Sequence, residues 1–349
     1  MNKKIVIASV LKPVDDVRSY WKIAQSLRQA NKYEINIIGN ASKSIKQESK
    51  ITFHAHRLRR TQYLKRIAIR YSIIQKTLRI KPDLLIISTH ELLMCALVLK
   101  CITGCKTVYD VQENYARNAS MNGVFTQVIG HLIRLKEIIL APFIDQFWLA
   151  EKCYEMELSF TCNKSLIIEN KALVQEKIPR SFLKMKALFS GTISEYSGAK
   201  VAMQWMQFLH SKYEKFEGIF IGQIHSQALL RWLKKEAQKT NKIQLICTTD
   251  PMPYEQILEK ISWANLGIIS YLPNQINESK FPTKLYEYSR YKLPYLVQED
   301  TKWQKEGSRL GGAIPVDFKG PPGEKYRIKH EAFESLFPST YPTEDTWES

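Results

Sequence analysis

The chain has 349 residues, more than one hydrophobic core usually holds, and 44% of them are hydrophobic, as in a globular protein of two domains. No apolar run approaches the roughly 18 residues of a membrane-spanning helix, and the apolar stretch near the amino terminus ends at Lys12, too early for a signal peptide. Six cysteines without a C-x-x-C pair indicate reduced thiols in a cytoplasmic protein and do not have the spacing of a metal site.

The formal net charge of +17 is concentrated in the amino-terminal part of the chain. Residues 1–150 contain 24 Lys and Arg against 10 Asp and Glu, whereas residues 151–349 contain 27 against 24. A one-sided basic field favours an anionic partner. The first half is therefore expected to contact a membrane surface, a lipid-linked phosphate or a nucleic acid.

The first half alternates predicted strands and helices. Residues 5–10 form a continuous apolar run, typical of a strand buried on both faces of a parallel sheet, and residues 17–30 follow as a helix with Trp21, Ala24 and Leu27 facing a core. The remaining predicted strands are 33–39, 51–55, 82–91, 108–115, 145–150 and 165–170, with helices at 92–102, 124–140 and 153–160. The pattern predicts a Rossmann-like domain, and the missing G-x-G-x-x-G turn argues against a dinucleotide cofactor.

Residues 57–80 combine a basic loop with an amphipathic helix. The apolar positions are spaced for one helix face that would cover the sheet: Leu64, Ile67, Ala68, Tyr71, Ile74 and Leu78. The cations that would meet an anionic membrane or an acceptor are Arg57, Arg59, Arg60, Lys65, Arg66 and Arg70. Each Lys or Arg near such a surface adds about 1 kcal/mol of attraction. The alternative is a helix whose basic face is only solvated.

Polar residues follow two apolar strands of the first half, at the ends of 82–91 and 108–115. In open parallel α/β sheets, ligands sit beyond the carboxyl ends of the strands. The candidates to line one wall of a cleft are His90, Glu91, Gln112, Glu113 and Asn114. The alternative is that each makes only local hydrogen bonds in its loop.

A charged stretch with a proline, residues 173–180, is predicted as a linker between domains at 1–172 and 181–335. The second half then repeats the alternation. Its strands are predicted at 186–193, 218–222, 243–247, 264–271 and 311–316, with helices that end near 212, span 226–239 and follow Tyr254. Gly191 near the end of the first of these strands would let a ligand approach the backbone closely.

Residues 277–296 are predicted as a loop, a short helix and a strand. Pro282 suits the first turn of a helix, and Thr283 and Lys284 then stand where backbone N–H groups and the positive dipole end attract a phosphate. Glu287 lies about one turn further on, on the same side, as a carboxylate able to accept hydrogen bonds from sugar hydroxyls. The alternative is a capped surface helix without a ligand.

Four segments resemble the retaining glycosyltransferase family 4 of the GT-B fold. They are residues 108–115, 189–193, 253–257 and 281–288 with Leu293 and Pro294, within a similarity that covers residues 3–318. The resemblance implies an α/β protein of two facing Rossmann-like domains with parallel sheets and a cleft between them. The first domain would face the acceptor and the membrane, the second would bind the donor, and the tail 336–349 would hold a shortened crossover helix.

The resemblance also implies a nucleotide diphosphate sugar as the donor. Glu287 matches the second Glu of the family's E-x7-E motif, which contacts the donor ribose. The implied donor-binding residues are Gly191, Thr192, Pro253, Tyr254, Glu278, Ser279, Lys280, Thr283, Lys284 and Glu287. The implied catalytic residues of the first domain are Gln112, Glu113 and His90.

The sequence departs from the family pattern at the donor diphosphate. The first Glu of the motif would fall at Ser279, and Thr192 and Ser197 stand where the family has an Arg and a Lys. We expect Lys280, Lys284 and the helix N-terminus to supply the missing positive charge.

A further departure is Gln112, where the family has a His. An amide can hydrogen-bond a sugar hydroxyl but cannot titrate. In a retaining enzyme of this kind the departing phosphate helps to deprotonate the acceptor, so a titrating His is dispensable.

The function that the resemblance implies is a retaining, metal-independent glycosyltransferase without a cofactor, acting on a glycan or lipid-linked acceptor in surface polysaccharide synthesis. It would be cytoplasmic and peripheral on the inner face of the membrane. Two alternatives are a catalytically inactive nucleotide-sugar-binding protein and a nucleic-acid-binding protein. The second is disfavoured, because the basic segment offers only Tyr63 and Tyr71 for base stacking.

Overall fold

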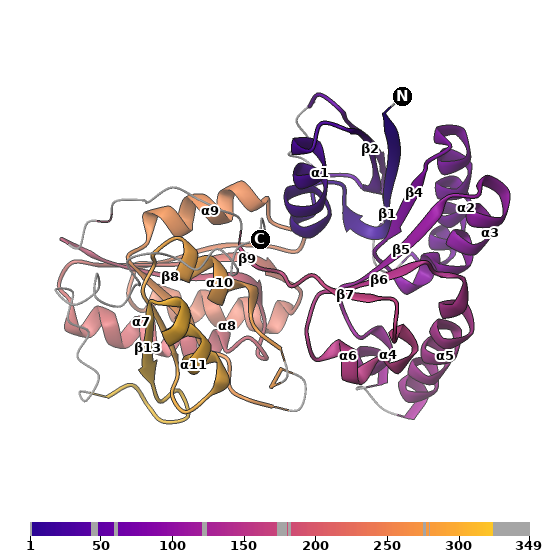
Figure 1. Ribbon diagram of the computed structural model, residues 1–349. Coiled ribbons are helices and arrows are strands. Elements are labelled where there is room, and N and C mark those ends of the chain that lie inside the picture. The colour runs from indigo at the N-terminus through magenta and orange to yellow at the C-terminus, as the bar shows by residue number, and fades with distance from the viewer. Residues whose placement is uncertain are drawn as a thin grey trace. The chain divides into compact units, whose positions relative to one another are not determined.

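The computed structural model describes residues 2–42, 48–58, 62–120, 124–172, 180, 183–274, 277–278 and 280–323. The chain forms two compact units, Met1–Asn170 and Lys171–Ser349, each with its own parallel sheet (Figure 1). Some predicted features lie outside the described residues: Arg59, Arg60, Ser279, residues 173–179 of the linker and the tail 336–349.

The sheet of the first unit has seven described strands in the order β3-β2-β1-β4-β5-β6-β7, each parallel to its neighbours. The strands are β1 Lys3–Pro13, β2 Tyr33–Asn40, β3 Ile51–His56, β4 Leu84–Ile87, β5 Lys106–Val111, β6 Gln146–Leu149 and β7 Ser165–Ile167. The central strand β1 is buried on both faces from Ile5 to Val10, as its apolar run predicts. The predicted parallel sheet is confirmed.

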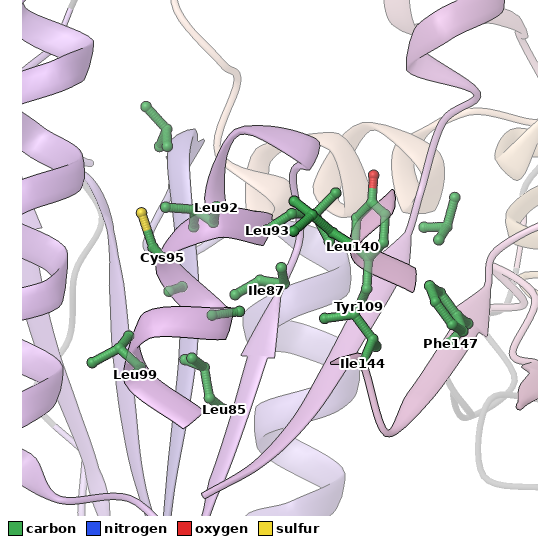
Figure 2. Packing of buried hydrophobic residues seen from close by; sticks show 14 of the residues in the cluster. Leu85, Ile87, Leu92, Leu93, Cys95, Leu99, Tyr109, Leu140, Ile144 and Phe147 are labelled. Atoms are coloured by element: carbon green, nitrogen blue, oxygen red, sulfur yellow. The ribbon is translucent and has the colours of Figure 1, made fainter. Parts of the chain in front are cut away.

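Three long helices of the first unit share one hydrophobic core with β1, β4, β5 and β6. The helices of this unit are α2 Tyr63–Ile80, α3 Leu93–Thr103, α4 Tyr115–Ala119, α5 Val124–Leu140 and α6 Tyr154–Glu157, with 3-10 turns at His90–Leu92, Ala141–Phe143 and Ser159–Thr161. Figure 2 shows Leu93 of α3 and Leu140 of α5 beside Ile87 and Tyr109 in this core.

The helix predicted at residues 17–30 differs in its geometry and in its buried face. It starts as a π-helix, Val17–Ala24, and continues as α1, Gln25–Gln29. The wider π-turns rotate the inward side away from the 3.6-residue spacing, so Tyr20 and Ile23 are buried with Ala24. Of the residues predicted to face the core, Trp21 and Leu27 are only half-buried.

The apolar stripe predicted on α2 is wrong in its first half. Leu64, Ile67 and Tyr71 are 84%, 60% and 63% exposed, and Ala68 is exposed as well. The second half of α2 does pack on the core, through the buried Ile73 and the partly buried Ile74 and Leu78. The apolar face of α2 therefore covers the sheet only towards the end of the helix.

The second unit repeats the α/β pattern with a six-stranded sheet in the order β10-β9-β8-β11-β12-β13, parallel throughout. Its strands are β8 Met185–Ile193, β9 Phe216–Ile224, β10 Ile243–Thr248, β11 Leu266–Ile269, β12 Tyr295–Gln298 and β13 Ala313–Val316. Its helices are α7 Ala199–Lys212, α8 Gln227–Gln238, α9 Tyr254–Trp263, α10 Thr283–Arg290 and α11 Lys302–Leu310. Only α11 was not predicted, although Thr301 caps it by accepting a hydrogen bond from the backbone of Gln304.

Arg180, near the start of the second unit, donates hydrogen bonds to the ends of α9 and α10. Its guanidinium donates to the carbonyl oxygens of Ile261 at 2.8 Å and Ala264 near the end of α9, and to those of Tyr291 at 2.8 Å and Lys292 at 3.1 Å after α10. Carbonyl oxygens at the end of a helix have no N–H donor within that helix. The Arg180 side chain supplies donors at the ends of both α9 and α10. Burial lowers the pKa of this guanidinium to about 10.

Candidate functional site

The helix predicted within residues 277–296 is α10, and it begins at Thr283. Pro282 has φ −62° and ψ 128°, so it caps the helix instead of lying in its first turn as predicted. The first N–H groups of a helix have no acceptor inside the helix, and they carry the positive end of its dipole. The start of α10 therefore favours an anion.

Lys284, the second residue of α10, places an ammonium group in an apolar setting. It is buried, with Nζ 4.1 Å from the ring centre of Phe189 and 5.1 Å from that of Tyr271. Among the described residues, Nζ has no hydrogen-bond partner. Burial lowers the pKa of Lys284 to about 7, and the carboxylate of Glu287 opposes this change. The site thus holds a buried ammonium group that no described residue hydrogen-bonds.

Glu287 lies one turn further along α10 and is also buried. Its Oε1 accepts a hydrogen bond of 3.0 Å from the hydroxyl of Tyr254, the first residue of α9. Burial and the negative charge of Glu287 raise the pKa of Tyr254 well above its ordinary value, so this hydroxyl stays a donor. Pro253 precedes α9 as its cap residue. The predicted residues Tyr254, Lys284 and Glu287 are therefore brought together.

Gly191 near the end of β8 has φ +91°, a backbone conformation that side chains with a Cβ rarely adopt. No described atom lies within 4 Å of the position that a Cβ would take, so the space above Gly191 is open. In the neighbouring strand, a Cβ on Gly222 would lie 1.8 Å from the carbonyl oxygen of Gly191. The two glycines together let β8 and β9 approach closely at this point.

These groups gather at the carboxyl ends of two adjacent central strands. Phe189 belongs to β8, Tyr271 follows β11, and β8 pairs directly with β11. Open α/β sheets bind their ligands at this position. The aromatic contacts of Lys284 were missed by the sequence reasoning, because nothing local to residues 281–288 points to β8.

The two positions where the family's cations are replaced have different environments. Thr192 is exposed at the end of β8. Ser197 is buried in a turn, where its Oγ donates to the carbonyl of Ser194 at 3.0 Å and accepts from the amide of Ser194 at 2.9 Å. Next to this turn, a Cβ on Gly198 would lie 1.9 Å from the carbonyl oxygen of Ser270. The turn therefore packs closely on Ser270, which follows β11.

The loop before α10 contributes less to the described site. Glu278 is exposed, Lys280 and Thr283 are half-buried, and Ser279 lies between described residues without being one of them. The carbonyl oxygen of Lys280 accepts a hydrogen bond of 2.8 Å from the indole of Trp303 in α11, which fixes the end of this loop.

In the first unit, Gln112 is part of a buried network beyond β5. Its amide donates to Asp110 at 2.6 Å, and its oxygen accepts from the ammonium of Lys12. Asp110 also accepts two hydrogen bonds from the Nε of Arg18, at 2.9 and 3.0 Å, and one of 2.6 Å from its Nη2. Arg18 donates further to the backbone carbonyl of Ile168. Lys12, Arg18 and Asp110 were not predicted as site residues. Lys12 closely follows the predicted strand 5–10, Arg18 lies in the predicted helix 17–30, and Asp110 lies within the predicted strand 108–115.

His90 and Glu113 belong to other networks than Gln112. His90 Nδ1 accepts a hydrogen bond of 3.1 Å from the ammonium of Lys136, and its ring lies against Tyr115. Burial, with the positive charges of Lys136 and two arginines, lowers the pKa of His90 to about 3, so the imidazole is neutral at physiological pH. Glu113 is exposed and accepts from the side chain of Asn118 at 3.0 Å.

The described basic residues of the predicted membrane or acceptor side are not all exposed. Arg57 and Lys65 are exposed, whereas Arg66 and Arg70 are partly buried. Arg66 forms an ion pair of 3.0 Å with Glu91. Part of this charge is thus used inside the first unit.

Within the described parts of the chain, no group of three or more His, Cys, Asp and Glu side chains is arranged to hold a metal ion. None of the described helices combines the length and the apolar character that crossing a membrane requires.

No protein-family model matches the chain, and no curated protein matches its sequence. Solved structures match its fold. Sucrose-phosphate synthase from Thermosynechococcus elongatus aligns with a TM-score of 0.66 at 9% identity, over 92% of this chain and 87% of that chain. Anabaena HepE, in a crystal structure with UDP, aligns with a TM-score of 0.58 at 10% identity, over 90% and 85%. The lipopolysaccharide outer core galactosyltransferase WaaB aligns with a TM-score of 0.53 at 12% identity, over 97% and 96%.

These neighbours and the two parallel sheets define the fold class. The chain has the GT-B fold, as the resemblance in sequence implied.

Proposed function

We propose that this protein is a retaining, metal-independent glycosyltransferase that uses a nucleotide diphosphate sugar. The observation that carries the proposal is Lys284, a buried ammonium without a described hydrogen-bond partner at the start of α10, one turn before the buried Glu287. A buried cation without a partner is costly, and a bound diphosphate would compensate its charge. The structural neighbour HepE has been crystallised with UDP and with UDP-glucose.

The proposed donor site places the diphosphate at Lys284 and the N-terminus of α10, with Lys280 and Thr283 beside it. The open backbone at Gly191 and Thr192 would face the sugar and the phosphates. Glu287, held by Tyr254, would accept hydrogen bonds from the ribose hydroxyls. The other proposed contacts are Pro253, Glu278 and Ser279.

In the proposed reaction, the bond between the sugar C1 and the diphosphate breaks as the acceptor oxygen bonds to C1 from the same face. The acceptor proton passes to the departing phosphate oxygen. Negative charge grows on the diphosphate as the bond breaks, so a fixed cation at Lys284 stabilises the transition state more than the ground state. In the first unit, Gln112, Glu113 and His90 would hold the acceptor by hydrogen bonds, without a titrating base.

The proposed acceptor is a glycan or a lipid-linked glycan of surface polysaccharide synthesis. The basic first unit would hold the protein peripherally on the inner face of the membrane through Arg57, Lys65 and neighbouring cations, including Arg59, Arg60, Arg66 and Arg70. The charge excess of residues 1–150 supports this proposal.

A thermal-shift panel of UDP, GDP, ADP and CMP tests the donor site. We expect one of these nucleotides to raise the melting temperature of the native protein and to have no such effect on Glu287→Ala. The matched control is Glu259→Ala, which removes an exposed carboxylate from α9. No stabilisation by any nucleotide, or equal stabilisation of Glu287→Ala, would refute the site.

A nucleotide-sugar-binding protein without transferase activity is the second candidate. The observation that favours it is Gln112, whose amide is already occupied by Lys12 and Asp110. This candidate predicts the same nucleotide stabilisation but no release of nucleoside diphosphate from any nucleotide sugar, with or without acceptor glycans.

A further inference from the structure

Helix α5 exposes an apolar face, whereas an ordinary surface helix exposes a polar one. The side chains at Phe125, Val128, Leu132, Leu135 and Ile139 recur at helical spacing and are all exposed, Phe125 by 78% and Leu132 by 60%. Two further exposed apolar residues of α5 are Ile129 and Ile138. A helix of a water-exposed surface would present its polar side here instead.

The charged residues of α5, unlike its exposed Gln127 and His131, face the protein. Glu137 is 3% exposed and accepts hydrogen bonds from the hydroxyl of Tyr109 at 3.1 Å and from Arg134 at 3.3 Å. Arg134 also donates to Asn114, at 2.8 Å. A Cβ on Gly130 would lie 2.6 Å from the carbonyl oxygen of Ala116, so α5 packs closely on α4. These contacts fix the rotation of α5 and hold its apolar side outward.

Two neighbouring helices continue the same surface. α3 contacts both α2 and α5, and Figure 1 shows the three helices along one side of the first unit's sheet. α3 exposes Met94, Val98 and Ile102, and α2 exposes Leu64, Ile67 and Tyr71. We call the exposed apolar residues of these three helices the apolar face. Exposed apolar side chains gathered on neighbouring helices mark an interaction site.

Positive charge accompanies the apolar face. α2 contains five Lys or Arg residues and no Asp or Glu, and Lys65 and Arg79 on it are exposed. Exposed Arg57 lies a few residues before α2. An apolar surface bordered by cations complements the boundary between the acyl chains and anionic headgroups of a lipid bilayer.

We propose that the apolar face docks this protein on an anionic lipid bilayer, with α5 in the plane of the membrane and the cations of α2 at the headgroups. A second copy of the chain fits the face less well, because a symmetric contact would bring the cations of one α2 close to those of the other. The inference deepens the membrane side of the proposed function but uses none of the residues of the proposed donor site.

Vesicle co-sedimentation of the full chain tests the inference. The native protein is expected to bind vesicles of phosphatidylglycerol and phosphatidylcholine, and Leu132→Ser with Leu135→Ser to weaken that binding about tenfold or more. Phe125→Ser with Val128→Ser is a second variant on the same face, with the same expected loss. The control, Met156→Ser with Leu183→Ser, removes two apolar side chains from outside the face that are even more exposed, at 86% and 89%, and is expected to bind as the native protein does.

The contribution of charge is measured in the same assay. Lys65→Glu with Arg79→Glu, high salt, or vesicles of phosphatidylcholine alone are each expected to weaken binding. Absent binding by the native protein, or unchanged binding by both apolar variants, overturns the inference. So does a native dimer that does not bind vesicles and that the apolar variants convert to a monomer, as seen by light scattering.

The nucleotide-induced rise in melting temperature separates this inference from the proposed function. The apolar variants are expected to keep that rise, which also shows that they are folded. Glu287→Ala is expected to lose it and still bind vesicles. Failure of one proposal therefore leaves a different signature from failure of the other.

Discussion

Packing, and not a hydrogen bond or an ion pair with a described residue, holds the Lys284 ammonium in its buried position. The aromatic rings of Phe189 and Tyr271 attract its ammonium, but they do not supply the hydrogen bonds that water supplies in the unfolded chain. This explains the direction of its pKa shift, to about 7. Because the pKa of Lys284 is lower in the folded state, the unfolded chain holds this proton more readily. The buried charge therefore lowers the free energy of unfolding by its full amount below pH 7. This loss disappears as the pH rises towards the pKa of Lys284 in the unfolded chain.

The first prediction concerns Lys284→Met. This change removes the buried charge and keeps an unbranched side chain that contacts aromatic rings well. At pH 7 the free energy of unfolding should increase by about 1 kcal/mol or more, which corresponds to a rise in melting temperature of about 2–4 °C. The same variant should lose its stabilisation by nucleotide. The control is Lys305→Met at an exposed position of α11. A variant that is less stable than the native protein, or that keeps the nucleotide effect, contradicts the assignment.

The second prediction is the pH dependence of donor affinity. A bound diphosphate raises the pKa of Lys284, so binding is strongest where the ammonium is already protonated. The affinity should be constant below pH 7 and fall as the pH rises above it, by up to about tenfold per unit. Isothermal titration with UDP-glucose from pH 6 to 9 measures this, because its diphosphate has no proton to lose in that range. Lys284→Met should bind weakly with a flat pH profile, and a flat profile of the native protein would argue against Lys284 as the phosphate contact.

Helix α5 shows how tertiary packing reverses an expectation from local propensity. Ala is a better helix former than Gly by about 1 kcal/mol, so Gly130→Ala in an isolated helix would be stabilising. In this protein the new Cβ would lie 2.0 Å from Ser120 Oγ and 2.6 Å from the carbonyl oxygen of Ala116. A hydroxyl can turn away, but a backbone carbonyl of α4 cannot.

The third prediction is that Gly130→Ala destabilises the protein by about 1–2 kcal/mol, since overpacking costs about 1–3 kcal/mol and exceeds the gain in propensity. Urea denaturation followed by circular dichroism measures the change. Ser120→Ala in the same chain removes one of the two close contacts, so the double variant should recover part of the loss. A Gly130→Ala protein more stable than the native one would show that α4 and α5 are packed less closely.

For the molecule as a whole, Arg180 connects the chain that follows the first unit to two helix ends of the second. The C-terminal carbonyls of α9 and those after α10 converge on one guanidinium. Both helices also begin at the proposed donor site, at Tyr254 and Thr283. Their relative position therefore depends on a residue at the opposite end of each helix.

The fourth prediction is that Arg180→Ala loosens α9 and α10 and lowers the stability of the second unit by about 2–4 kcal/mol, because several buried carbonyls lose their donor. Hydrogen exchange followed by mass spectrometry should show faster exchange in residues 254–264 and 283–292, with no change in the first unit. Arg180→Lys should give an intermediate result, since an ammonium cannot reach as many acceptors at once. Equal acceleration across both units would contradict a local role.

Much of the fold follows from local sequence patterns. Continuous apolar runs such as residues 5–10 predicted buried parallel strands, and the spacing of strands and helices predicted two α/β units, because these patterns depend on residues close together in the chain. The spacing of apolar residues predicted the wrong buried positions in two helices. The π-turns of residues 17–24 moved the buried face from Trp21 to Tyr20, and the exposed half of α2 follows a core-like spacing without a core to cover.

The sequence by itself determined the parallel α/β architecture, the basic first half, and a short helix with Lys284 near its start and Glu287 about one turn further on. These features are local or compositional, so no long-range information was needed. Only the tertiary structure decided that Lys284 lies between Phe189 and Tyr271, that Gln112 is held by Lys12 and Asp110, and that α5 turns its apolar side outward. Those three facts depend on contacts between segments far apart in the chain, and it is packing, not spacing, that sets burial, pKa and the direction in which a helix faces.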